Sequence, residues 1–153
     1  MKRFLGLAIG VVLLIVMSSG VGAEGKSDLA EARKGTAKYH NVQKALKDGY
    51  LPTDEFVEVP GLGVMGYHYV NPKLIDEKVD TSAPEVLLYV PKANVGLQLV
   101  GVEYLSLTDN SLFGQNFDSP IPGVVPEYSL HVWIWKHNPN GMFSPFNPSI
   151  KYK

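Results

Sequence analysis

The chain has 153 residues, with 14 Lys and Arg against 15 Asp and Glu, four His and no Cys. This length is typical of one domain, and the near-neutral balance of charge argues against a nucleic-acid-binding surface. The lack of Cys excludes disulfide scaffolds, Cys-ligated zinc, iron–sulfur clusters and thiol catalysis.

Residues 1–23 have the pattern of a secretory signal peptide. Two basic residues at positions 2 and 3 precede an apolar run at positions 4–17, and small residues then lead to Ala23. The apolar run is shorter than the about 20 residues that span a bilayer. Cleavage after Ala23 leaves residues 24–153 as a single globular domain with 12 basic and 15 acidic side chains. The sequence therefore predicts a secreted or periplasmic protein with no membrane span after signal cleavage.

One long helix is predicted over Ser27–Asp48, before the first proline of the chain. Ser27 is the expected N-cap, and Gly49 is the expected left-handed residue beyond the helix end. Gly35 is a weak point within this helix because glycine disfavours helical backbone.

After Pro52 the apolar residues alternate with period two, which is typical of strands. A hairpin is expected at Asn94–Gly96, where turn residues separate two strand-like segments. In the longer of the two segments, period two places Glu103 on one face with Leu97, Leu99 and Leu105. The predicted strand segments are Val57–Val59, Val64–Val70, Glu85–Val90, Leu97–Leu107 and Tyr128–Lys136.

Two long connections complete the chain, residues 108–127 and the tail from His137. Both contain Phe residues, so we expect them to pack back on the sheet as lids or flaps rather than to act as flexible linkers. The predicted fold is α+β: an N-terminal helix packed on a curved, mostly antiparallel sheet of about five strands, cystatin-like or NTF2-like. The alternative is a small β-barrel or sandwich with one accessory helix.

Glu103 is the most informative single residue, because a carboxylate on an apolar strand face is costly unless it is paired, hydrogen-bonded or metal-bound. His68 and His131 also lie in the middle of predicted strands. If the three meet, they form a candidate divalent metal site or a general acid–base group. The structural alternative is an inert polar core. His40, on the predicted helix, is a weaker candidate ligand.

An organic-ligand pocket is the other reading of the same region. Strict alternation places His131, Trp133 and Trp135 on one strand face, where large aromatic side chains beside a polar group could line a pocket. The predicted ligand-binding residues are His68, Tyr69, Glu103, His131, Trp133 and Trp135.

Several segments resemble an uncharacterised family of small secreted bacterial proteins. The resemblance covers most of residues 24–153 and implies a single extracytoplasmic domain, but it supplies no activity. The segments that carry it are Tyr39-His40, Lys44-Ala45, Asp48–Tyr50, Met65–Asn71, Pro84–Tyr89, Leu99–Tyr104, Leu130–Lys136, Asn138-Pro139, Gly141 and Phe143.

Three functions follow as hypotheses. The first is an extracytoplasmic domain that binds a small ligand in the aromatic pocket. The second is a hydrolase or lyase that depends on a divalent metal held by His68, Glu103 and His131. The third is a structural or interaction protein with an inert polar core. No cofactor beyond that divalent metal is indicated, and the expected partner is a small molecule or a metal ion rather than a nucleic acid.

Overall fold

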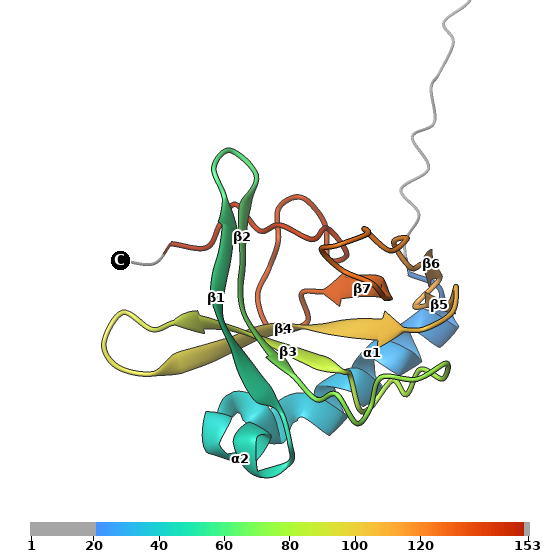
Figure 1. Cartoon of the computed structure of the whole chain (residues 1–153), viewed down its shortest axis with the longest axis horizontal. Helices are drawn as coiled ribbons and strands as arrows, with labels where there is room; N and C mark the ends of the chain where they lie inside the picture. The colour runs from blue at the N-terminus through green and yellow to red at the C-terminus, as the bar shows by residue number, and fades with distance from the viewer. Residues whose placement is uncertain (1–20, 152–153) are drawn as a thin grey trace, which may run out of the picture.

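The computed structural model describes residues 21–151, so the apolar part of the predicted signal peptide lies outside the described residues. The chain forms a mixed α+β fold in which N-terminal helices precede a curled, antiparallel five-stranded half-barrel (Figure 1). This confirms the predicted fold class of a helix on a curved sheet. The helices of residues 21–151 are all too short or too polar to cross a membrane.

The predicted single helix is interrupted. Helix α1 spans Ala23–Thr36, a 3₁₀ turn η1 spans Ala37–His40, and α2 spans Val42–Lys47. Ser27 is therefore inside α1 and not its N-cap. The break follows Gly35, where a Cβ would lie 2.1 Å from the carbonyl oxygen of Ser82, so close backbone packing and not only helix propensity requires glycine here.

A new start signal follows the break. The side chain of Asn41 accepts a hydrogen bond from the Gln43 N–H at 3.0 Å and so caps α2. Gly49, at φ 99°, takes the left-handed conformation predicted beyond the end of the helical region.

The five main strands lie in the order β1-β2-β3-β4-β7, and all neighbours are antiparallel. A separate hairpin, in which β5 and β6 have two residues each, lies within the predicted connection after β4. The strand bounds are β1 Leu51–Val59, β2 Gly63–Val70, β3 Val86–Pro91, β4 Leu97–Ser106, β5 Ser111–Leu112, β6 Gln115–Asn116 and β7 Tyr128–Val132.

Strand β7 is shorter than predicted, because the chain leaves the ladder after Val132. The N–H of Trp133 donates to Met142 O in the C-terminal tail, and the N–H of Trp135 donates to Val100 O. Strand β1, in contrast, is longer than predicted and largely exposed. Its Pro52 is tolerated because β1 is an edge strand.

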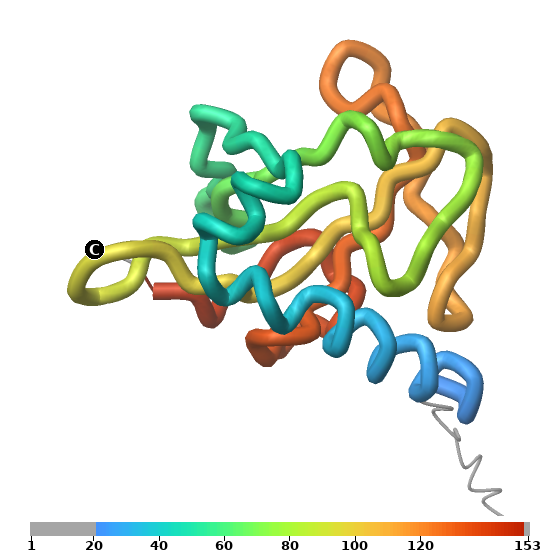
Figure 2. The backbone as a smooth tube through the Cα atoms, turned by 90° about the horizontal axis from the view of Figure 1, so that it is seen from below, coloured from blue at the N-terminus to red at the C-terminus, as the bar shows by residue number. Residues whose placement is uncertain are grey.

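The sheet has a separate apolar cluster on each face. The first contains Leu29, Tyr89 and Tyr104 and lies on the side of α1, which crosses under the sheet (Figure 2). The second contains Val86, Leu88 and Trp133 on the opposite side, and includes Ile150 of the C-terminal tail.

The predicted lids pack as expected. Asn147 pairs with Val64 of β2 through N–H···O bonds of 3.0 and 3.2 Å, and it is fully buried. Phe113 and Phe117, from the connection after β4, are buried in the cluster beside α1. Both connections therefore close the core rather than linking elements loosely.

A β-bulge in β4 corrects the predicted strand face. Tyr89 pairs with Leu99 and Leu88 pairs with Gly101, so Val100 is an extra residue in the ladder. One extra residue reverses which face the following side chains occupy. Leu97 and Leu99 consequently pack beside α1, whereas Leu105 belongs to the opposite cluster. Glu103, two residues before Leu105, does not share a face with Leu97 and Leu99 as predicted.

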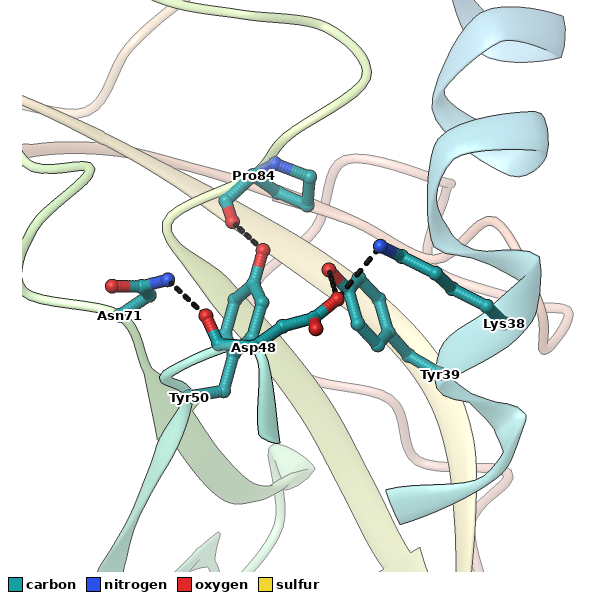
Figure 3. A network of polar contacts seen from close by, with 6 residues as sticks. All are labelled: Lys38, Tyr39, Asp48, Tyr50, Asn71 and Pro84. Carbon is teal, nitrogen blue, oxygen red and sulfur yellow. Dashed lines mark hydrogen bonds and ion pairs between the residues drawn. The ribbon is translucent and has the colours of Figure 1, made fainter. Parts of the chain in front are cut away.

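A polar network joins the helices to the strands (Figure 3). Asp48 Oδ2 accepts hydrogen bonds from Lys38 Nζ at 2.7 Å and from the Tyr39 hydroxyl at 3.0 Å. The Asp48 carbonyl accepts a bond from Asn71 Nδ2 at 3.1 Å. The buried Tyr50 hydroxyl donates to Pro84 O at 2.7 Å. These bonds fix the start of β1 against the loop that leads into β3.

Candidate metal centre

Three strands each contribute one side chain to a largely buried His–Glu–His group. His68 is on β2, Glu103 on β4 and His131 on β7. Glu103 and His131 are direct cross-strand partners. His68 is opposite Leu88 of β3 and therefore two strands away from Glu103, so the curl of the sheet is needed to bring it close.

The donor atoms are close but are not hydrogen-bonded to one another. His131 Nε2 lies 3.5 Å from Glu103 Oε1, and His68 Nε2 lies 3.6 Å from Glu103 Oε2. One donor atom from each residue falls within 4.8 Å of the other two. Each carboxylate oxygen thus faces a different imidazole, at a separation too long for a good hydrogen bond.

These separations fit ligands around one ion. Zinc is bound by His nitrogen and carboxylate oxygen at about 2.0–2.2 Å with tetrahedral geometry, which places neighbouring donors about 3.4 Å apart. The 3.5 and 3.6 Å separations, each to a different oxygen of Glu103, are near that spacing, and the three donors as a set lie within 4.8 Å of one another.

His131 shows a second sign of a missing partner. The residue is 5% exposed, and neither Nδ1 nor Nε2 has a hydrogen-bond partner among the described residues. Buried polar atoms are normally satisfied, and leaving one unpaired costs about 1–3 kcal/mol. An ion bound to one ring nitrogen would remove part of that cost.

Burial also sets the charge of the group. Desolvation raises the pKa of Glu103 to about 7, against the opposing effects of His68 and a hydrogen bond with Ser129. Desolvation lowers the pKa of His131 to about 4, and it lowers the pKa of His68 although the Glu103 charge opposes this. Both imidazoles are therefore neutral near pH 7, which is the form that binds metals.

The other predicted site residues lie elsewhere. Tyr69 packs beside α1, with its ring 4.8 Å from that of Tyr89, on the face opposite the His–Glu–His group. Trp135 is on that side too, because the chain leaves β7 after Val132; its Nε1 donates to Thr36 Oγ1 at 3.2 Å. His40 is exposed, and its ring lies 4.4 Å from the Trp135 ring.

Of the predicted aromatic pocket, only Trp133 is in the cluster on the other side of the sheet. It is 2% exposed, and its Nε1 donates to Ser144 O at 2.7 Å, so it anchors the C-terminal tail. The six predicted ligand-binding residues therefore do not line one common cavity. Trp135 is separated from His131 because alternation does not continue past the end of β7. Tyr69 directly follows His68 on β2 and therefore lies on the opposite face of the sheet.

Sequence reasoning missed a hydrogen-bond partner of Glu103 and a second buried carboxylate. Ser129 hydrogen-bonds Glu103, and its position two residues before His131 on the same strand was a usable signal. Glu85 is 1% exposed, accepts the Leu105 N–H at 2.9 Å, and has its pKa raised by desolvation to about 7. Glu85 was predicted as the first residue of a strand, but β3 begins at Val86, and no spacing rule indicated that its carboxylate is buried.

Comparisons with protein-family models, curated proteins and solved structures found no match to this chain. The resemblance to a secreted bacterial family stays a prediction, and the assignment of function depends on the site itself.

Proposed function

We propose that this protein binds one divalent transition-metal ion, with zinc as the first candidate, through His68, Glu103 and His131. Two neutral imidazoles and one carboxylate suit zinc and its neighbours better than they suit magnesium or calcium, which prefer oxygen ligands.

The observation that carries the proposal is the state of His131. Its side chain is buried without a hydrogen-bond partner for either ring nitrogen, and Nε2 is 3.5 Å from a carboxylate oxygen that is itself enclosed. An inert polar core would be expected to satisfy these atoms by direct hydrogen bonds. A bound ion explains both the spacing and the unpaired nitrogen.

Metal binding would also brace the fold. The three donors come from β2, β4 and β7, so one ion would link strands that are not all neighbours in the sheet. A ligand that binds only the folded state stabilises it by about 2.7 kcal/mol at a free concentration of 100 Kd.

The test is stoichiometric metal uptake by the purified protein after treatment with a chelator. We expect one zinc ion per chain by elemental analysis, with a rise in melting temperature on zinc addition. His68→Ala and His131→Ala should abolish both effects. His40→Ala and His137→Ala are matched controls, because both residues are exposed and outside the group; these variants should retain the metal.

Two results would refute the proposal. One is a protein that takes up no zinc and melts at the same temperature with or without it. The other is uptake that His40→Ala reduces as much as His131→Ala does, since this would indicate adventitious binding to surface imidazoles.

The number of donors favours a reactive rather than a closed metal site. The group found among residues 21–151 has three protein donors, and catalytic zinc sites use three protein ligands with water in the fourth position. The metal-dependent hydrolase hypothesis therefore rests on the same residues. Its test is zinc-dependent hydrolysis of an activated ester by the wild type that Glu103→Gln eliminates.

We also propose that the protein is exported from the cytoplasm. The support is the basic start, apolar run and small residues of positions 1–23. Cleavage after Ala23 would make Glu24, in the first turn of α1, the first residue. N-terminal sequencing of the protein recovered from a secreting bacterial host tests this; an intact N-terminus at Met1 would contradict it.

A further inference from the structure

A second feature, apart from the His–Glu–His group, is a cavity of about 270 Å³ where β3 ends and β4 begins. The end of β3 and the hairpin that follows form one side, and the start of β4 forms another. The C-terminal tail, which Ile150 anchors in the core, supplies the rest. None of the three proposed metal ligands lines this cavity.

The charge of the cavity differs from that of the protein. Three lysines line it, Lys92, Lys136 and Lys151, and no carboxylate does, although the chain as a whole has a net charge of −1. None of the ion pairs found among the described residues involves any of the three. Several unpaired ammonium groups around one concave space raise the local concentration of anions.

Part of the lining of the cavity is apolar, although its accessible surface is more polar than apolar. Val90, Val100 and Ile150 line the cavity and belong to the buried cluster on this face of the sheet, so each is at most 8% exposed. Gln98 adds one amide among them. Apolar walls with a few polar groups are typical of sites for small organic molecules.

We propose that this cavity binds a small organic phosphate monoester, with its dianionic head among the three lysines and its apolar body beside Val90 and Ile150. The multiple positive charges favour a phosphate over a monoanionic carboxylate. The apolar part of the lining favours an organic ester over inorganic phosphate, which would leave that part uncovered. This site supplies the small-ligand role that the aromatic pocket does not.

The test uses zinc-free full-length protein labelled with ¹⁵N, so that it does not depend on the metal proposal. Phenyl phosphate, benzoate and inorganic phosphate are titrated separately, and amide shifts are followed in two-dimensional NMR spectra. We expect phenyl phosphate to bind most tightly and to shift the amides of Lys92, Gln98 and Lys136.

Lysine variants provide the specificity control. Lys92→Gln and Lys136→Gln should each weaken phenyl phosphate binding about two- to fivefold, the range expected for one exposed charge pair. Lys26→Gln, on the exposed surface of α1, should have no effect. The His131→Leu variant should bind phenyl phosphate as the wild type does, which separates this site from the metal centre.

Four results would overturn the inference. Shifts scattered over other lysine-bearing surfaces would show non-specific binding, as would an equal loss in Lys26→Gln. Equal affinity for inorganic phosphate and phenyl phosphate would show that the apolar residues do not contribute to binding. Equal affinity for benzoate would remove the preference for a dianion.

Discussion

His131 Nε2 lies 3.5 Å from Glu103 Oε1, yet neither ring nitrogen of His131 has a hydrogen-bond partner among the described residues. The two residues are direct cross-strand partners, so the backbone holds them face to face. This combination of enforced proximity and unmet hydrogen-bonding capacity is the basis of the metal proposal, and it predicts opposite effects of one substitution under two conditions.

Without metal, the His131→Leu variant should be more stable than the wild type. With zinc present, it should be less stable than the wild type. Removal of an unpaired buried imidazole recovers about 1–3 kcal/mol of desolvation cost, whereas loss of a ligand removes the stabilisation from metal binding. Urea unfolding with a chelator and with excess zinc measures both. A variant less stable than the wild type without metal would show that His131 is satisfied in the folded protein.

Glu85→Gln should change how stability depends on pH. Burial raises the pKa of Glu85 from 4.5 to about 7, so the unfolded chain releases this proton first. Ionisation therefore costs the wild type on the order of 3 kcal/mol of stability as the pH rises from below 4.5 to above 7. Glutamine has no such cost and can still accept the Leu105 N–H.

The free energy of unfolding of Glu85→Gln, minus that of the wild type, should consequently increase with pH across this window. Glu103 and the histidines are present in both proteins, and their contributions cancel in the difference. Denaturant unfolding at pH 4, 5.5 and 7.5 gives the measurement; a difference that does not vary with pH would mean that Glu85 titrates normally.

Gly35→Ala should destabilise the protein, although alanine is the better helix former. A Cβ at this position would lie 2.1 Å from Ser82 O, a backbone atom that cannot move aside cheaply. Overpacking of this kind costs about 1–3 kcal/mol. Lys34→Ala, at an exposed position of the same helix, is the control and should be nearly neutral in thermal unfolding. A Gly35→Ala variant as stable as the wild type would contradict the close approach.

Tyr50→Phe should cost more stability than Tyr39→Phe. The Tyr50 hydroxyl donates to Pro84 O at 2.7 Å and the residue is 1% exposed, so its loss leaves a buried carbonyl unpaired, at about 1–3 kcal/mol. Tyr39 donates to Asp48, which remains partly exposed and keeps its bond with Lys38. Chemical denaturation measures the loss of unfolding free energy in each variant. A larger loss in Tyr39→Phe would mean that the bond to Asp48 contributes more stability than the bond to Pro84 O.

Local patterns in the sequence determined much of the fold. Period-two alternation located the strands near Val64–Val70, Val86–Pro91 and Leu97–Ser106, because each strand has one face toward each apolar cluster. The hairpin near Asn94–Gly96 and the turn at Gly49 followed from residues that tolerate these backbone shapes. The sequence alone also identified His68, Glu103 and His131 as a group worth testing.

Only the tertiary structure decided which residues meet. The bulge at Val100 reverses the face of the rest of β4, and nothing in the apolar pattern indicates that extra residue. The end of β7 at Val132 sends Trp135 to the side of α1, away from His131. His68 reaches Glu103 across an intervening strand because the sheet curls. Periodicity fixes the direction of a side chain only within an uninterrupted strand, whereas bulges, strand ends and sheet curvature depend on packing between distant segments.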